Sequence, residues 1–586
     1  MRNFLKNVLS TIVGVVLSVI VVILLFIGII SITISSFDNE KESKIYPNSI
    51  LKIDLTSPIV ERSSDNPFEN LSFTNMDPQK ELEFKSILDN IEKAKTDDRI
   101  KGIYLNSPFV NAGLSQTEEI RNKLLDFKKS EKFIISYTEN YSQDGYYLSS
   151  VADEIYLNPE GMFELKGLSA QIMFYKGLLE KLDIQAQVIR HGKFKSAIEP
   201  FILDKMSEAN REQVSLLLTT ISDNILDSIA SQRGLTLSKV EELADNLELN
   251  TAANCLENNF VDALIYQDEL ENKLKIKLGE EVKLRLISLS KYNNVKVEKQ
   301  GKISRDKIAI IYAVGEINSG KGDLKSIGSE TTAKTIKKAR EDKRVKAIVL
   351  RINSPGGSAL ASDVIWRETT LAQAEKPLVI SMGDVAASGG YYIACAADTI
   401  VANPTTITGS IGVFGLIPNL QQFYKNKLGI TLDTVNTHKY ADMGINRALS
   451  SFERAKIKKV IENIYSTFIS HVAEGRDMSI AAVDDIGQGR VWTGYDAKRL
   501  GLIDVLGGLE TAINIAADLA KLSDYQLVSL PKKEDPLETF IKEITREESK
   551  YIANYLGVDR KFVKSIENLI KGEKIQTRMP FILEIN

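Results

Sequence analysis

Apolar residues along most of the chain form short runs that alternate with longer, charged stretches. The runs 345–352 and 377–380 are largely apolar and are bounded by small residues, glycine or proline, which is typical of buried strands. The stretches 206–233 and 449–476 are long and are predicted to be helices. Strands that alternate with helices predict parallel sheets with crossover connections, so the predicted fold class is α/β.

This pattern occurs twice, with an offset of about 245 residues. Residues 98–105 resemble residues 343–350, and Gly-Tyr-Tyr-Leu at 145–148 resembles Gly-Tyr-Tyr-Ile at 390–393. We therefore predict two tandem copies of one α/β domain. The predicted organisation is an N-terminal segment, a first repeat, a linker rich in Lys and Asn, a second repeat and a charged tail, over residues 1–37, 38–292, 293–306, 307–530 and 531–586.

The N-terminal segment predicts a membrane anchor. No charged side chain occurs between Val8 and Phe37, and residues 9–34 are almost wholly apolar, long enough for a helix to cross a bilayer core of about 30 Å. A cleaved signal peptide is the alternative, but its apolar region spans only about 7–15 residues before a small-residue cleavage site. Because basic residues precede the segment and acidic residues follow it, we expect a cytoplasmic N-terminus with the remaining chain across the membrane.

Charge and cysteine content exclude other classes of function. The net charge of −4 argues against a nucleic-acid partner. The two cysteines, Cys255 and Cys395, give at most one bridge and no metal-ligand spacing, so we expect neither a metal nor another cofactor.

Candidate chemistry lies at two turns of the second repeat. The run 377–380 leads into small residues, and a helical pattern begins near Gly389, which places Ser388 at a strand-to-helix turn where free N–H groups could stabilise an anion. The alternative is a tight turn that only lets the helix pack on the sheet. Upstream, Gly356 and Gly357 follow another predicted strand, and such glycines can form an oxyanion hole from backbone N–H groups.

The two repeats differ at these turns. Ser388 aligns with Gln143, and the glycine pair aligns near residues 109–110, so the first repeat lacks both features. In the first repeat, Lys195 stands where the second repeat has Ala441. These differences suggest that one repeat supplies a nucleophile and the other a lysine.

A serine nucleophile needs a neighbour that accepts its proton. Lys195 is surrounded in sequence by apolar and small residues, and burial would lower its pKa from about 10.4 so that it could be neutral. The alternative is an ordinary solvated lysine. Lys439 is a second candidate base, although it recurs as Lys193 and so suggests a structural role.

Histidine is the remaining candidate base. His191 and His438 recur nearly in register between the repeats, as structural positions would, and His471 lies in a charged helical stretch and is expected at the surface. Neither His191 nor His438 has an evident acidic partner nearby in sequence.

Several motifs together resemble one protease family. The two-copy layout is accompanied by Gly-Asp-Val-Ala-Ala-Ser-Gly-Gly-Tyr-Tyr around Ser388, Asn-Ser-Pro-Gly-Gly at 353–357, Phe-Lys-Ser-Ala-Ile-Glu-Pro-Phe around Lys195, Thr-Gly-Ser-Ile-Gly-Val around Ser410, and Gly-Arg-Val-Trp-Thr-Gly at 489–494. This combination resembles the long form of the signal peptide peptidase A family, also called protease IV, over roughly residues 48–525 and the anchor.

The resemblance implies a crotonase-like fold related to the Clp protease proteolytic subunit, and a Ser-Lys dyad. The family's nucleophile matches Ser388, its general base matches Lys195 and its lysine-orienting hydroxyl matches Ser410. It also implies a homo-oligomer, a tetrameric bowl at the bacterial inner membrane with periplasmic catalytic domains, that degrades remnant signal peptides and other unfolded peptides.

We therefore expect a membrane-anchored serine endopeptidase in which Gly356, Gly357 and Gly389 hold the oxyanion. Two alternatives remain. A crotonase-type enzyme acting on acyl-thioesters would require a catalytic carboxylate and a surface that contacts a nucleotide. A non-catalytic membrane scaffold would not explain why the lysine and the serine are divided between otherwise matching repeats.

Overall fold

The computed structural model describes residues 44–64, 81–279, 283–296, 304–533 and 575–579, together with isolated positions before residue 22. The central feature is a pair of sheets that share one order of parallel strands. The first runs β8-β6-β5-β4-β1-β9, formed by Ala263–Leu264, Glu154–Leu157, Phe133–Thr138, Ile100–Leu105, Ser49–Ile53 and Leu286–Ser288. The second contains the equivalent order β20-β16-β15-β13-β10-β21, formed by Val505–Leu506, Thr399–Ala402, Leu378–Ala387, Val345–Ser354, Lys307–Val314 and Gln526–Leu530. The predicted α/β class and the duplication are confirmed.

Matching side-chain contacts support the duplication. The Tyr146 hydroxyl donates to the carbonyl oxygen of Phe260 over 2.7 Å, and the Tyr391 hydroxyl donates to that of Leu502 over 2.8 Å. Each tyrosine is fully buried and fixes the chain that leads into an edge strand of its own repeat, β8 or β20. The repeats therefore share tertiary contacts as well as sequence.

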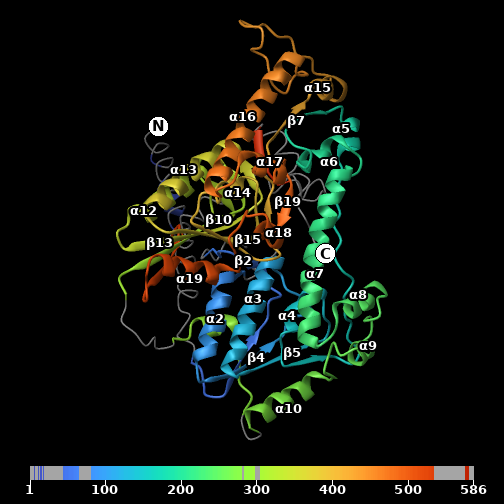
Figure 1. The fold of residues 1–586 in the computed structure, drawn as a ribbon, viewed down its shortest axis with the longest axis vertical. Helices are drawn as coiled ribbons and strands as arrows, with labels where there is room; N and C mark the ends of the chain where they lie inside the picture. Colours follow the sequence, from blue (N-terminus) through green and yellow to red (C-terminus); the bar gives the residue numbers. More distant parts are fainter. Residues whose placement is uncertain are drawn as a thin grey trace.

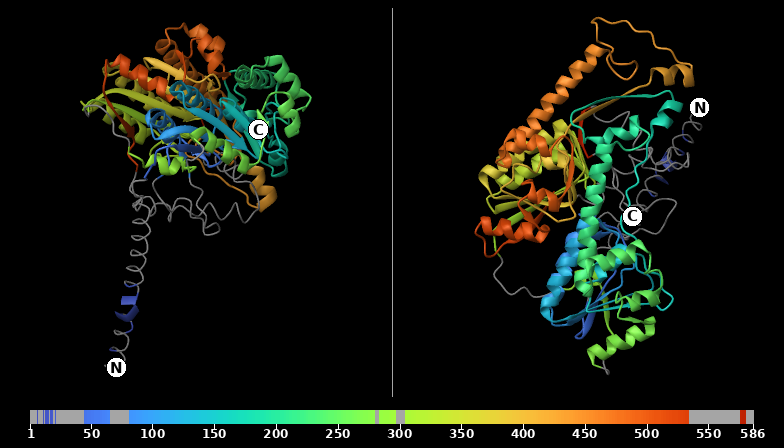
Figure 2. Two further views of the ribbon diagram at one scale, coloured as in Figure 1. Left: turned by 90° about the horizontal axis from the view of Figure 1, so that it is seen from below. Right: turned by 45° about the vertical axis from the view of Figure 1, so that its right-hand side comes forward.

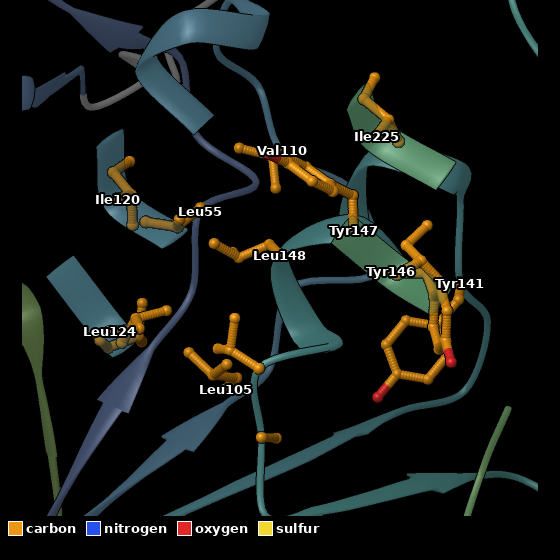
Figure 3. Close-up of a cluster of buried hydrophobic side chains, with 14 of the residues drawn as sticks. Leu55, Leu105, Val110, Ile120, Leu124, Tyr141, Tyr146, Tyr147, Leu148 and Ile225 are labelled. Carbon is orange, nitrogen blue, oxygen red and sulfur yellow. The ribbon is translucent and has the colours of Figure 1, made fainter. Parts of the chain in front are cut away.

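Burial of apolar side chains stabilises each repeat. In the first, helices α2 (Phe84–Thr96), α3 (Leu114–Phe127) and α4 (Gln143–Ser149) cover the sheet, and Figure 3 shows Leu105, Ile120 and Leu148 meeting beneath them. Each fully buried side chain of this kind contributes about 1.5–3 kcal/mol.

Two long helices flank the sheets at the positions predicted from sequence. Helix α7 (Glu208–Arg233) begins at Ser207, whose hydroxyl accepts the N–H of Asn210, and helix α16 (Ser451–Gly475) begins at Ser450 in the same manner. Such N-caps typically stabilise a helix by about 1 kcal/mol. In Figure 1, α7 runs along one side of the molecule and spans both repeats.

A third sheet combines strands from both repeats and from the tail. Its order is β12-β11-β14-β22-β18-β7, formed by Ser326–Gly328, Glu316–Asn318, Gly356–Ser358, Ile575–Arg578, Phe414–Asn419 and Gln185–Arg190. Strand β7 belongs to the first repeat but pairs antiparallel with β18 of the second, so the chain that follows β7 enters the second repeat. Figure 2 shows this part of the first repeat extending away from its own sheet.

Buried ion pairs also join the repeats. Arg351 on β13 has no exposed surface, and its guanidinium donates to Glu61 over 2.9 Å and to Glu119 over 2.8 Å, both of which come from the first repeat. On β15, Asp384 accepts the backbone N–H of Ser115 at the start of α3 over 3.0 Å. Polar contacts therefore bind the second sheet to the first repeat.

Three predictions fall mostly or partly outside these residues. The charged tail over 531–586 is one of them, since only 531–533 and 575–579 are described. The predicted anchor over 9–34 lies mostly outside the described part of the chain, and no helix within the described part is long and apolar enough to cross a membrane. The middle of the predicted linker 293–306 is likewise outside it. Helix α11 (Leu289–Asn293) precedes that region and β10 follows it.

Candidate active site

Ser388 lies between the end of β15 and the short helix α14 (Gly389–Tyr392), as the sequence predicted. Its backbone has φ 56° and ψ −112°, a conformation that costs a non-glycine residue about 1–3 kcal/mol. The turn is held because the Ser388 N–H donates to the oxygen of Gly409 over 2.8 Å and its carbonyl accepts the N–H of Tyr392. This geometry presents the hydroxyl at the N-terminus of a helix.

Lys195 reaches this serine from the first repeat. It follows β7, and its Nζ lies 2.8 Å from Ser388 Oγ, 3.0 Å from Ser410 Oγ and 3.0 Å from the carbonyl oxygen of Ser410. Lys195 and Ser388 are 193 positions apart in sequence. The structure thus brings together the three side chains that the resemblance selected.

The lysine is in an environment that favours its neutral form. Lys195, Ser388 and Ser410 have no exposed surface, and burial lowers the pKa of the Lys195 ammonium well below its usual value. A neutral amine has two N–H donors and one lone pair. The two oxygens of Ser410 can accept both donors, which leaves the lone pair for the Ser388 hydroxyl proton.

Close packing fixes the stem of Lys195. Gly489 has φ 85°, and a Cβ there would lie 2.6 Å from Lys195 Cβ, so only glycine fits. The side chain of Gln213 on α7 donates to the oxygen of Phe194 over 3.1 Å and accepts the N–H of Val491 over 3.3 Å. The sequence alone does not point to Gln213. It identifies the motif that contains Gly489 but does not indicate that this glycine packs against Lys195.

The two glycine turns of the second repeat are in contact. Gly356 has φ 95°, and a Cβ at this position would lie 2.7 Å from the backbone nitrogen of Gly389. Gly357 lies in β14, where it pairs with Ile317 on one side and Thr577 on the other. The backbone of Gly356 therefore lies against that of Gly389, next to Ser388, and the Gly356 N–H donates to Ser354 Oγ over 3.1 Å.

The alternative bases lie elsewhere. His191 stacks on Tyr465, with ring centroids 4.1 Å apart, and His438 is exposed. His471 stacks on Trp366 at 3.4 Å and is only partly exposed, so the expectation of a surface position was wrong because the apolar ring of the tryptophan covers it. Among the described residues, no histidine hydrogen-bonds to Ser388.

The second candidate lysine is not buried. Lys439 is exposed, and its ammonium lies 5.3 Å from the ring centroid of Tyr440. Lys195, by contrast, is buried and contacts Ser388, which favours Lys195 as the base.

Comparison with known proteins agrees with this site. Residues 126–281 and 370–523, one segment in each repeat, match Peptidase family S49. The chain is 37% identical to Protease 4 of Salmonella typhi over 89% of this chain and 86% of the relative. It is 38% identical to the chloroplastic serine protease SPPA of Arabidopsis thaliana over 86% and 75%, and 35% identical to Protease 4 of Haemophilus influenzae over 73% and 72%.

Solved structures of a ClpP1 variant from Listeria monocytogenes and of a membrane-bound stomatin-specific protease align at 16% identity. The alignments cover 35% and 39% of this chain and 94% and 99% of the solved chains, with TM-scores of 0.24 and 0.26. The family match and the three relatives cover both repeats, and on that basis the chain belongs to peptidase family S49, together with Protease 4, and is a serine endopeptidase.

Proposed function

We propose that the chain hydrolyses peptides with a Ser388–Lys195 dyad. The observation that carries this proposal is the buried contact of 2.8 Å between Lys195 Nζ and Ser388 Oγ. Ser410 orients the amine through its hydroxyl and carbonyl oxygens. Backbone N–H groups at Gly389 and at the Gly356–Gly357 turn stabilise the oxyanion.

Each step then has a defined proton carrier. Ser388 Oγ bonds to the peptide carbonyl carbon while neutral Lys195 takes the hydroxyl proton. The tetrahedral intermediate collapses, the C–N bond breaks, and the Lys195 ammonium returns that proton to the leaving amine. Water then attacks the acyl-enzyme, again with Lys195 as the base, and releases the acid and the free serine.

We further propose a membrane location and a substrate class. The apolar segment 9–34 would anchor the chain in the bacterial inner membrane, with the N-terminus in the cytoplasm and the catalytic repeats in the periplasm. Remnant signal peptides, which are unfolded and leave the membrane slowly, fit a nucleophile without exposed surface better than folded proteins do. A homo-oligomer, tetrameric by the resemblance, would enclose such sites.

An acyl-thioester reaction is a less suitable second candidate. Crotonase-type chemistry needs a carboxylate at the reacting carbon, and among the described residues the Ser388 hydroxyl has Lys195 as its polar side-chain partner. The buried amine fits acyl transfer to serine.

The direct test uses the full chain in detergent with a fluorophosphonate probe and peptide mapping. We expect the label on Ser388, hydrolysis of a synthetic signal peptide, and no cleavage of a folded protein. Lys195→Met should abolish both labelling and hydrolysis, whereas Lys193→Met, an exposed lysine two positions away, should retain both. Labelling of another serine would contradict the proposed dyad.

Membrane location is tested separately. Full-length protein expressed in bacteria should resist alkaline extraction from the inner membrane, and a tag at the C-terminus should be digested by protease added to spheroplasts. A soluble protein, or a protected tag, would contradict the proposed topology.

A further inference from the structure

The tail contributes a strand that lies in the middle of the mixed sheet. Strand β22 (Ile575–Arg578) pairs antiparallel with β14 through Gly356↔Arg578 and Gly357↔Thr577, and antiparallel with β18 through Phe414↔Gln576. Neighbouring strands lie about 4.7–4.9 Å apart. Without β22, the edges of β14 and β18 would face each other across a slot that is one strand wide.

The slot is next to the candidate oxyanion hole. A Cβ at Gly356 would lie 2.2 Å from the carbonyl oxygen of Thr577 and 2.7 Å from the nitrogen of Gly389, so both atoms border the same small space. The Thr577 hydroxyl donates to the oxygen of Gly357 over 3.3 Å and lies 3.1 Å from where a Cβ of Gly389 would be. Thr577 has no exposed surface.

An extended peptide binds an open sheet edge through its main chain. The slot between β14 and β18 offers two such edges at once, directly beside Ser388. Strand β22 already uses both, and Met579 N–H donates to the oxygen of Pro355 over 2.6 Å as the chain leaves the slot. A substrate strand and β22 cannot occupy this position together.

We propose that residues 575–579 occupy the peptide-substrate position and act as a built-in competitive inhibitor, which a substrate must displace. This inference rests on the proposed function. Strand β22 is held by main-chain pairs with β14 and β18, which another extended peptide can replace, and by the buried side chains of Thr577 and Met579. The ion pair of Arg578 with Glu316, at 3.3 Å, joins two partly exposed side chains and adds little.

The test compares two full-length variants with the wild type. Thr577→Lys places a long cation against Gly389, where there is no room, and should expel the strand. Thr577→Ser keeps the hydroxyl and is the matched control. With a fluorogenic peptide, we expect KM to fall about tenfold and kcat to stay unchanged in Thr577→Lys, and both constants to match the wild type in Thr577→Ser.

A synthetic peptide with the sequence of residues 575–579, blocked at both ends, gives the second measurement. It should inhibit Thr577→Lys competitively, at concentrations about tenfold lower than those that inhibit the wild type. If β22 were only a structural strand, Thr577→Lys would lose activity at unchanged KM and the peptide would restore it, and this result would overturn the proposal.

Failure of the peptidase proposal can be recognised independently. If neither the wild type nor Thr577→Lys hydrolyses peptides, the binding of a fluorescently labelled peptide of residues 575–579 is measured by fluorescence anisotropy. Tighter binding to Thr577→Lys than to the wild type supports the shared position, and equal binding to the two proteins overturns it.

Discussion

The turn after β15 in the second repeat and the turn after β5 in the first repeat come from one ancestral pattern but differ in what they expose. In the second repeat the turn carries Ser388 against Lys195. In the first repeat the aligned residue is Gln143, whose side-chain oxygen accepts the N–H of Gly167 over 2.9 Å. The neighbouring Asp144 accepts the N–H of Val110 over 2.8 Å. Local side chains therefore satisfy the backbone donors of the first repeat.

Strand length explains where the open turn lies. Strands β13 and β15 have 10 residues each, whereas their equivalents β4 and β5 have 6 each. The longer strands carry the glycine turn and Ser388 beyond the edge of the sheet, to where the lysine after β7 arrives. A duplicated fold can thus form one site from both copies. Here the second repeat has the longer strands, and the first repeat contributes the loop after β7.

The largest expected effect comes from removing the lysine's ability to accept a proton. Lys195→Arg should lower kcat/KM about 1000-fold or more, because the guanidinium pKa stays above about 12. In the wild type, the lowered pKa of Lys195 means that activity rises with pH as the amine loses its proton and levels off well below the usual lysine pKa. A pH-rate profile measures this. Retained activity in Lys195→Arg would show that another group is the base.

Next in size is the joint between the repeats. Arg351→Met leaves Glu61 and Glu119 buried without their cation and should destabilise the protein by about 3–5 kcal/mol. Urea unfolding measures the loss. Arg344→Met is the control, because Arg344 is exposed just before the same strand and should change stability by less than about 0.5 kcal/mol.

Gly356→Ala tests the glycine turn that the first repeat lacks. A Cβ at Gly356 would lie 2.7 Å from the backbone nitrogen of Gly389 and would disturb this oxyanion donor, so kcat should fall about 100- to 1000-fold. Phe109→Ala, at the aligned and exposed position of the first repeat, should have no effect on kcat. Equal effects of the two variants would remove the distinction between the turns.

A smaller effect is expected at Glu118, which faces Thr405 across the joint. The pKa of the Glu118 carboxyl is raised to about 7, mainly by burial. The hydrogen bond that the Thr405 hydroxyl donates to the carboxylate partly offsets this rise. A raised carboxyl pKa gives stability that is complete below about 4.5 and is lost as the pH rises through about 7. Glu118→Gln should therefore be more stable than the wild type at pH 8, by roughly 1–3 kcal/mol, and not at pH 4.5. Urea midpoints at both pH values provide the measurement.

The last prediction is that a serine at position 143 does not restore activity. Gln143→Ser puts a hydroxyl at the aligned turn of the first repeat, where Lys166 is adjacent in the described part of the chain, but the Lys166 ammonium is exposed and pairs with Glu164. The double variant Ser388→Ala with Gln143→Ser should be as inactive as Ser388→Ala alone, in both hydrolysis and fluorophosphonate labelling. Recovered labelling would mean that the first repeat retains a working site.

The sequence by itself determined the repeated α/β architecture, because buried parallel strands need apolar runs and these recur at one offset. It also indicated Ser388 at its turn, since local backbone geometry follows from nearby small residues. The family motifs also selected Lys195 and Ser410, but only the tertiary structure shows how Lys195 reaches Ser388: strand β7 crosses into the other repeat through long-range pairing that no local pattern encodes. Gln213 and Thr577 could not be identified from the sequence for the same reason. Gln213 contacts the residue before Lys195 from a distant helix, and Thr577 lies in a short strand that is recognisable only by its pairing with Gly356 and Gly357.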